Sequence, residues 1–152
     1  MKRKYSFQVH PEARAWAPNP EMQHRLEMEF PLPVTVRLWP RSMVGQVTNK
    51  VGLQPHAFRA RSIENVADVF VDPTETRESI AWLIAHELAH HELKRKYPEA
   101  KRAMDTVRPG LPVAGDAFHD YDTEEAWCDN RATAIVGKRL DRKWWRDRTR
   151  AF

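Results

Sequence analysis

A change of hydrophobic period at Asp72 constrains this chain more than any other feature of its sequence. Before it, the segment 66–71 (VADVFV) is apolar and β-branched, which indicates a buried strand. After it, Asp72 as N-cap, Pro73 at the first helical position and Glu75 at the third form a helix-start signal. No breaker follows until Pro98. The pattern therefore predicts a strand followed at once by a long helix, and an apolar run near the start of that helix indicates that it lies in the core.

Shorter patterns predict the remaining elements. They are strands at 33–39 and 57–61 and helices at 21–29, 99–107 and 122–139. Short strands beside long helices favour an α+β fold. We expect a small, mostly antiparallel sheet to pack on the long helix and on the last helix.

The length of 152 residues suits a single domain, 1–152. Its first 30 residues are rich in proline, so we expect segment 1–30 to be irregular apart from the short helix. The formal charge of +4 is uneven: residues 1–129 hold 17 Lys and Arg against 19 Asp and Glu, whereas residues 130–152 hold 8 against 2. We therefore expect a slightly acidic body followed by a basic C-terminal appendage at 138–152.

Nothing in the sequence calls for secretion or for a membrane. Cys128 is the single cysteine, so no internal disulfide can form. The basic N-terminus has no apolar segment behind it, and the longest apolar run is only 80–85. We expect a cytoplasmic protein without a membrane span.

The long predicted helix carries the motif HExxH as His86, Glu87 and His90. Residues i and i+4 lie on one face of a helix, so the two imidazoles can bind one Zn²⁺ ion. Glu87 then projects beside the metal, where it can act as a general base. The motif predicts a catalytic zinc site, which needs a third protein ligand and an open fourth position.

The residues after His90 exclude one source of that ligand. In the metzincin pattern a glycine stands three residues after the second histidine and a ligand six after, but this chain has Leu93 and Lys96 there. The alternative is a glutamate from a separate downstream helix, and segment 121–137 (YDTEEAWCDNRATAIVG) supplies candidates.

With HELAH at 86–90 and EAWCDNRA at 125–132, the chain resembles the gluzincin metallopeptidases, notably small HtpX-like peptidases and ImmA/IrrE-type domains. The resemblance covers about residues 66–137. It departs from those families at Trp127, where they often have an acidic residue, and at Cys128, where alanine is usual.

The resemblance implies that Glu125 is the third zinc ligand. Asp129 lies one turn later on the same face, where it can accept a hydrogen bond from the outer nitrogen of a ligating histidine. Glu124 is the rival ligand, but it lies about 100° away around the helix and would leave Asp129 facing elsewhere.

The implied activity is peptide-bond hydrolysis, with Zn²⁺ polarising the scissile carbonyl and Glu87 as general base. His119 and Tyr121, in the loop before the second helix, are candidate catalytic residues that stabilise the oxyanion. The resemblance also places strand 66–71 beside the cleft, where an extended peptide can pair with a sheet edge. A protein or peptide is thus the expected substrate.

A second hypothesis uses the basic appendage. Segment 138–152 interleaves cations with Trp144 and Trp145, a composition that suits phosphate contacts and base stacking but also an amphipathic helix. The alternative to a peptidase is therefore a regulatory or nucleic-acid-associated protein that binds through this tail. The intact Glu87 favours the peptidase.

Overall fold

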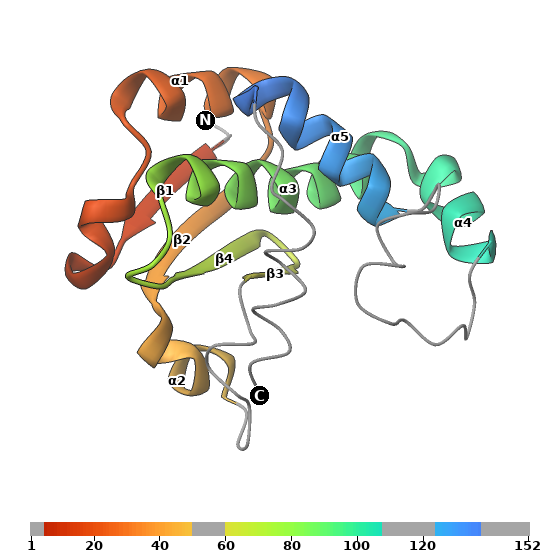
Figure 1. Ribbon diagram of the computed structural model, residues 1–152. Coiled ribbons are helices and arrows are strands. Elements are labelled where there is room, and N and C mark those ends of the chain that lie inside the picture. The colour runs from red at the N-terminus through yellow and green to blue at the C-terminus, as the bar shows by residue number, and fades with distance from the viewer. Residues whose placement is uncertain (1–4, 50–59, 108–123, 138–152) are drawn as a thin grey trace.

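The computed structural model describes residues 5–49, 60–107 and 124–137 (Figure 1). Within them the chain has an α+β fold, as predicted. Its elements are β1 (Tyr5–Val9), the 3-10 helix η1 (Pro11–Trp16), α1 (Pro20–Glu29), β2 (Val34–Pro40), the 3-10 helix η2 (Arg41–Met43), α2 (Val44–Thr48), β3 (Ala60–Ile63), β4 (Val66–Val71), α3 (Arg77–Lys96), α4 (Pro98–Val107) and α5 (Glu124–Val136). No helix among the described residues is both long and apolar enough to cross a membrane.

The four strands form one mixed sheet in the order β1-β2-β4-β3. β1 pairs with β2 and β2 with β4 in parallel, and only β3 pairs with β4 in an antiparallel hairpin. The prediction of a mostly antiparallel sheet is therefore wrong. Alternating side chains reveal which face of a strand is buried but not the direction of its neighbour. Here α1 lies in the crossover from β1 to β2, which lets those two strands run parallel.

The N-terminal segment is more regular than expected. β1 pairs with β2 along its whole length, from Tyr5 opposite Val34 to Val9 opposite Leu38, so the prediction that 1–30 is irregular is wrong for this strand. The short helix near 21–29 is confirmed as α1, whose N-cap Asn19 accepts a hydrogen bond from the backbone of Met22.

The main helix begins later than its start signal suggested. The N-cap of α3 is Thr76, whose side chain accepts a hydrogen bond from the backbone of Ser79 at 3.0 Å. Asp72 instead closes a turn by accepting from the backbone of Thr74 at 2.8 Å. Glu75 is buried and pairs with Arg41 at 2.8 Å. The predicted cap residues thus connect β4 to the helix without belonging to it.

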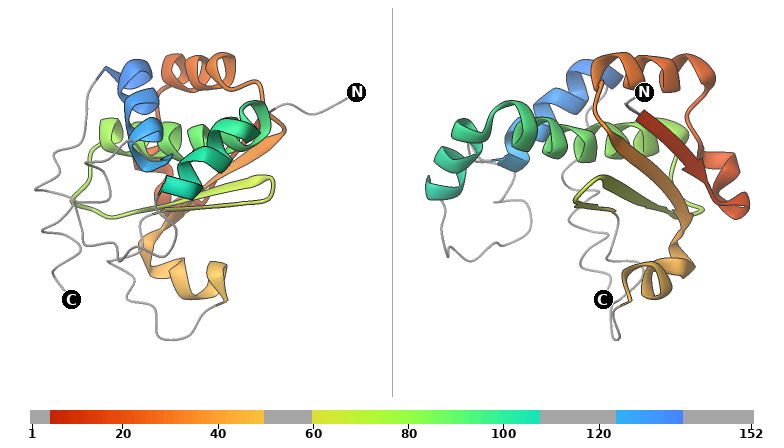
Figure 2. Two further views of the ribbon diagram at one scale, coloured as in Figure 1. Left: turned by 90° about the vertical axis from the view of Figure 1, so that its right-hand side faces the viewer. Right: turned by 180° about the vertical axis from the view of Figure 1, so that it is seen from behind.

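Helix α3 is the centre of the molecule. It lies between the sheet on one side and α1 and α5 on the other, as the three views show (Figures 1 and 2). Almost every residue from Ile80 to Leu93 is buried, which confirms that this is a core helix. Trp82 fixes its contact with α5 by donating a hydrogen bond from Nε1 to Thr133 Oγ1 at 3.1 Å.

The two remaining helices follow their predicted positions closely. α4 begins at Pro98, directly after α3 ends, and α5 ends at Val136. Gly137 follows with φ of +80° and donates its backbone N–H to Thr133 O at 2.8 Å. A left-handed glycine of this kind ends helices, which explains why α5 stops before the predicted position 139.

Candidate metal centre

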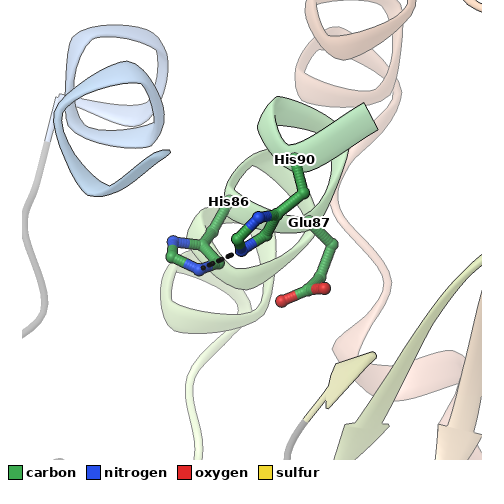
Figure 3. A group of neighbouring side chains, drawn as sticks. All are labelled: His86, Glu87 and His90. Atoms are coloured by element: carbon green, nitrogen blue, oxygen red, sulfur yellow. Dashed lines mark hydrogen bonds between the residues drawn. The ribbon is translucent and has the colours of Figure 1, made fainter. Parts of the chain in front are cut away.

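Two histidines of α3 meet on the side of the helix that faces α5. His86 and His90 stand one turn apart, with their Nε2 atoms separated by 3.1 Å (Figure 3). Trp82, one turn before His86, stacks on its ring at 5.4 Å with an interplanar angle of 22°. The indole therefore limits the movement of the His86 ring, which is only 6% exposed.

The first turns of α5 bring carboxylates to these rings. Glu125 places Oε2 at 2.8 Å from His86 Nε2 and Oε1 at 3.3 Å from His90 Nε2. Asp129, one turn later, places Oδ1 at 2.9 Å from His86 Nδ1. The two carboxylates thus act on opposite nitrogens of His86, as the i and i+4 spacing predicted.

Glu124 approaches the site from a different direction. Its Oε2 lies 2.5 Å from His90 Nδ1, the nitrogen that faces away from His86. Its Oε1 lies 3.0 Å from Lys101 Nζ, so both of its oxygens have partners. As rival ligand, Glu124 is therefore less well placed than Glu125, because it contacts neither Nε2 atom.

These donors fit a tetrahedral divalent cation. Zn–N and Zn–O bonds of about 2.0–2.1 Å place tetrahedral ligands about 3.3 Å from one another. The two Nε2 atoms lie 3.1 Å apart, and each lies close to one oxygen of Glu125, at 2.8 Å between His86 and Oε2 and at 3.3 Å between His90 and Oε1, which is near that spacing. His86, Glu87 and His90 also form a group able to hold a metal ion, with one ligand atom from each within 4.8 Å. Glu125 is the better third donor, since its oxygens lie at 2.8 and 3.3 Å from those nitrogens.

The acid–base balance of the site favours positive charge. Burial opposes protonation of His86, but the Asp129 and Glu125 carboxylates outweigh it and raise the pKa of His86 to about 9. Burial likewise opposes ionisation of Glu125, yet its hydrogen bonds to His86 and His90 hold its pKa well below the usual range. Protons therefore occupy the space between the histidine rings and Glu125, where positive charge is favourable. A bound metal ion would displace these protons.

Glu87 lies beside the two imidazoles, on the side of α3 that faces β3 (Figure 3). Its Oε1 accepts a hydrogen bond of 2.6 Å from Ser62 Oγ on that strand. A cleft of about 460 Å³ opens here. Its walls come from β3 and the following turn, α3, α4 and α5, and consist of Ala60, Arg61, Ser62, Glu64, Glu87, His90, His91, Lys94, Lys101, Glu124 and Glu125.

The strand beside the cleft is not the predicted one. β4 lies inside the sheet with β2 and β3 on its two sides, so it has no free edge for a peptide. β3 is one of the two edge strands among the described residues, and it lines the cleft. The strand beside the cleft that could pair with a peptide is therefore β3 (Ala60–Ile63), and not segment 66–71 as expected.

Several other predicted residues have a clear position. His91, directly after the second histidine, is buried and donates from Nε2 to Val66 O at 3.0 Å, so it serves packing. Cys128 is buried, and burial raises the pKa of its thiol to about 12, so it stays a neutral packing residue. His119, Tyr121 and the basic segment 138–152 lie outside the described residues.

Two contacts of this site were not predicted from the sequence. Ser62 and Lys101 reach Glu87 and Glu124 from other elements, 25 and 23 residues away. Neither stands in a motif, and only the fold brings them to the cleft. Glu124 was named from the sequence only as the rival ligand, and its contact with His90 Nδ1 was not predicted.

No protein-family model, no curated protein and no solved structure matches the chain.

Proposed function

We propose that this protein is a zinc-dependent metallopeptidase of the gluzincin type. The observation that carries the proposal is the convergence of His86 Nε2, His90 Nε2 and the Glu125 carboxylate within 3.3 Å of one another. A second carboxylate, Glu87, adjoins this group at the wall of a cleft. A purely structural zinc site has no need of such a base, which favours catalysis over the regulatory alternative.

Each side chain then has a defined role. His86, His90 and Glu125 hold the metal, and Asp129 orients His86 through Nδ1. When bound, Zn²⁺ supplies a Lewis acid that polarises the scissile carbonyl and acidifies water. Glu87 takes one proton from the attacking water as its oxygen bonds to the carbonyl carbon. Glu87 then gives that proton to the amine nitrogen as the carbon–nitrogen bond breaks.

The cleft suits an extended peptide. Among the described strands, β3 has no neighbour on its outer side, and this edge follows one wall, where main-chain hydrogen bonds can align a substrate without regard to its side chains. Ser62 belongs to the same strand and contacts Glu87. A substrate that pairs with β3 would therefore lie close to the general base.

The test compares the metal content and the activity of three proteins. Wild type should bind about one zinc per chain and cleave members of a mixed peptide library, as detected by mass spectrometry. Glu87→Gln should keep the zinc and lose cleavage, because it removes only the base. Glu99→Gln, the same change at an exposed position of α4, should behave as wild type.

Other outcomes decide against the proposal. Zinc bound by wild type without cleavage of any peptide would favour the regulatory alternative. Full zinc affinity in Glu125→Ala would show that the third ligand is another residue.

A further inference from the structure

We propose that Glu124 and Lys101 form a positioning pair for the metal centre. Glu124 orients His90 through its outer nitrogen, and Lys101 keeps Glu124 in that position and away from the metal. This inference rests on the proposed function, since it assumes that His90 is a ligand. It assigns roles to two residues that the HExxH motif and the downstream glutamate do not include.

The first step is the hydrogen bond between Glu124 and His90. An ionised carboxylate only accepts hydrogen bonds, so the 2.5 Å contact places a proton on His90 Nδ1. The lone pair of the neutral ring then lies on Nε2, the nitrogen that faces His86 and Glu125. Asp129 acts on His86 in the same way from the other side. Each histidine thus has its own carboxylate, one from each end of the six-residue segment 124–129.

The second step is the conflict that two adjacent carboxylates create. Glu124 and Glu125 are consecutive, and both contact His90. A divalent cation would attract both carboxylates. If Glu124 turned inward as a fourth protein ligand, the open position that catalysis needs would be closed.

Lys101 resolves this conflict. Its Nζ lies 3.0 Å from Glu124 Oε1, while Oε2 of the same carboxylate faces His90. The two side chains are only 29% and 19% exposed, so solvent screens their attraction less than on an open surface. Lys101 also stands in the first turn of α4, where its backbone N–H donates to Tyr97 O at 3.0 Å. The backbone that carries the Lys101 side chain is therefore fixed to the end of α3.

Zinc affinity tests the contact with His90. It is measured on the full chain by competition with a chromophoric chelator. Glu124→Ala should weaken zinc binding by about 10- to 100-fold, the range found for outer partners of ligating histidines. Glu124→Gln keeps an acceptor for the Nδ1 proton and should recover part of that loss. Lys96→Met, at an exposed position in the last turn of α3 outside the cleft, should leave the affinity unchanged.

Cobalt(II) substitution tests the role of Lys101. The visible spectrum of the wild-type cobalt protein should respond to added azide, which enters the open position. Lys101→Met should abolish that response, because Glu124 is then free to occupy the position. Lys101→Met combined with Glu124→Gln should restore it. An unchanged azide response in Lys101→Met would overturn the role of Lys101.

The variants separate this inference from the proposed function. If wild type binds no zinc, the proposed function itself fails. If Glu125→Gln abolishes binding and both Glu124 variants keep wild-type affinity, only the positioning pair is wrong. If instead the Glu124 variants abolish zinc binding and Glu125→Gln keeps wild-type affinity, Glu124 is the ligand and the inference is overturned. Circular dichroism of the metal-free variants identifies any that fail to fold.

Discussion

At the scale of single residues, the two facing imidazoles explain why positive charge is favourable at this site. Asp129 and Glu124 hold a proton on the Nδ1 atoms of His86 and His90, so neutral rings direct both Nε2 lone pairs toward each other at 3.1 Å. Glu125 adds an anionic carboxylate at the same point. Lone pairs and negative charge repel one another in a buried space. Only positive charge, as protons or as a metal ion, makes this arrangement favourable.

Ser62 provides the clearest single-residue prediction. Its hydroxyl donates to the Glu87 carboxylate at 2.6 Å, and hydrogen bonds to charged groups contribute about 1.5–3 kcal/mol. Ser62→Ala should therefore lower kcat for peptide cleavage by about tenfold or more, because Glu87 loses the contact that orients it. Zinc affinity should not change, since Ser62 contacts no histidine in the part of the chain that the structure describes.

Ser62→Thr is the matched control. It keeps the hydroxyl on a residue that suits a strand, so it should retain most of the activity. If Ser62→Ala cleaves peptides at the wild-type rate, the hydrogen bond has no part in orienting Glu87.

At the scale of elements, the start of α3 yields a stability prediction. Thr76 caps the helix by accepting from the backbone of Ser79. Removing a threonine N-cap costs about 1 kcal/mol, so Thr76→Ala should lower the free energy of unfolding by about that amount in urea titrations. Thr76→Ser keeps the capping oxygen and should stay near wild type. Equal stability of all three proteins would contradict the assignment of Thr76 as the cap.

The same helix shows how far the sequence predicts the fold. Its core position and its end before Pro98 follow from local patterns, and so does the spacing of His86 and His90. Its start was wrong because Asp72, the expected N-cap, closes a turn with Thr74, and Glu75, expected at the third helical position, pairs with Arg41 from a distant element. A tertiary ion pair of that kind leaves no local signal.

The sheet and the cleft were predictable to different degrees. The strand at 66–71 was correct at both ends, because its apolar run has clear boundaries. β1 was missed although YSFQV alternates, since five residues next to a basic, proline-rich stretch give a weak signal. Strand direction and the Lys101 contact with Glu124 depend on how separate elements meet. Such facts follow from the whole fold and not from any short segment.

At the scale of the whole molecule, one buried carboxylate makes stability depend on pH. Asp68 is fully buried in the sheet, where it accepts from Arg37 on β2, Arg61 on β3 and the Trp39 indole. Burial opposes its ionisation, but these donors outweigh it and hold the pKa of Asp68 below its ordinary value. The carboxylate therefore stabilises three of the four strands together.

The sign of the pH effect follows from that lowered pKa. The folded protein binds the proton more weakly than the unfolded chain does, so the stabilisation is complete above the unfolded pKa of about 3.9. It is lost as the pH falls from there through the folded pKa. Asp68→Asn should lower the free energy of unfolding by about 3 kcal/mol at pH 7. Its stability should then fall less steeply below pH 4, as measured by urea titrations from pH 7 to pH 2.5.

The distribution of charge over the molecule gives the last prediction. Residues 1–129 hold two more acidic than basic residues, so the metal centre belongs to a slightly acidic body, whereas the excess of cations is confined to the end of the chain. Binding to a polyanion depends on the number of cations that replace its counterions. Deleting 138–152, directly after Gly137, should therefore remove most of any affinity for DNA and flatten its dependence on salt, while peptide cleavage persists.

Full-length protein with the tail lysines and arginines changed to glutamine should behave like the deletion, which separates the effect of charge from that of chain length. If the shortened chain binds DNA as tightly as wild type with the same salt slope, the acidic body itself carries a binding surface.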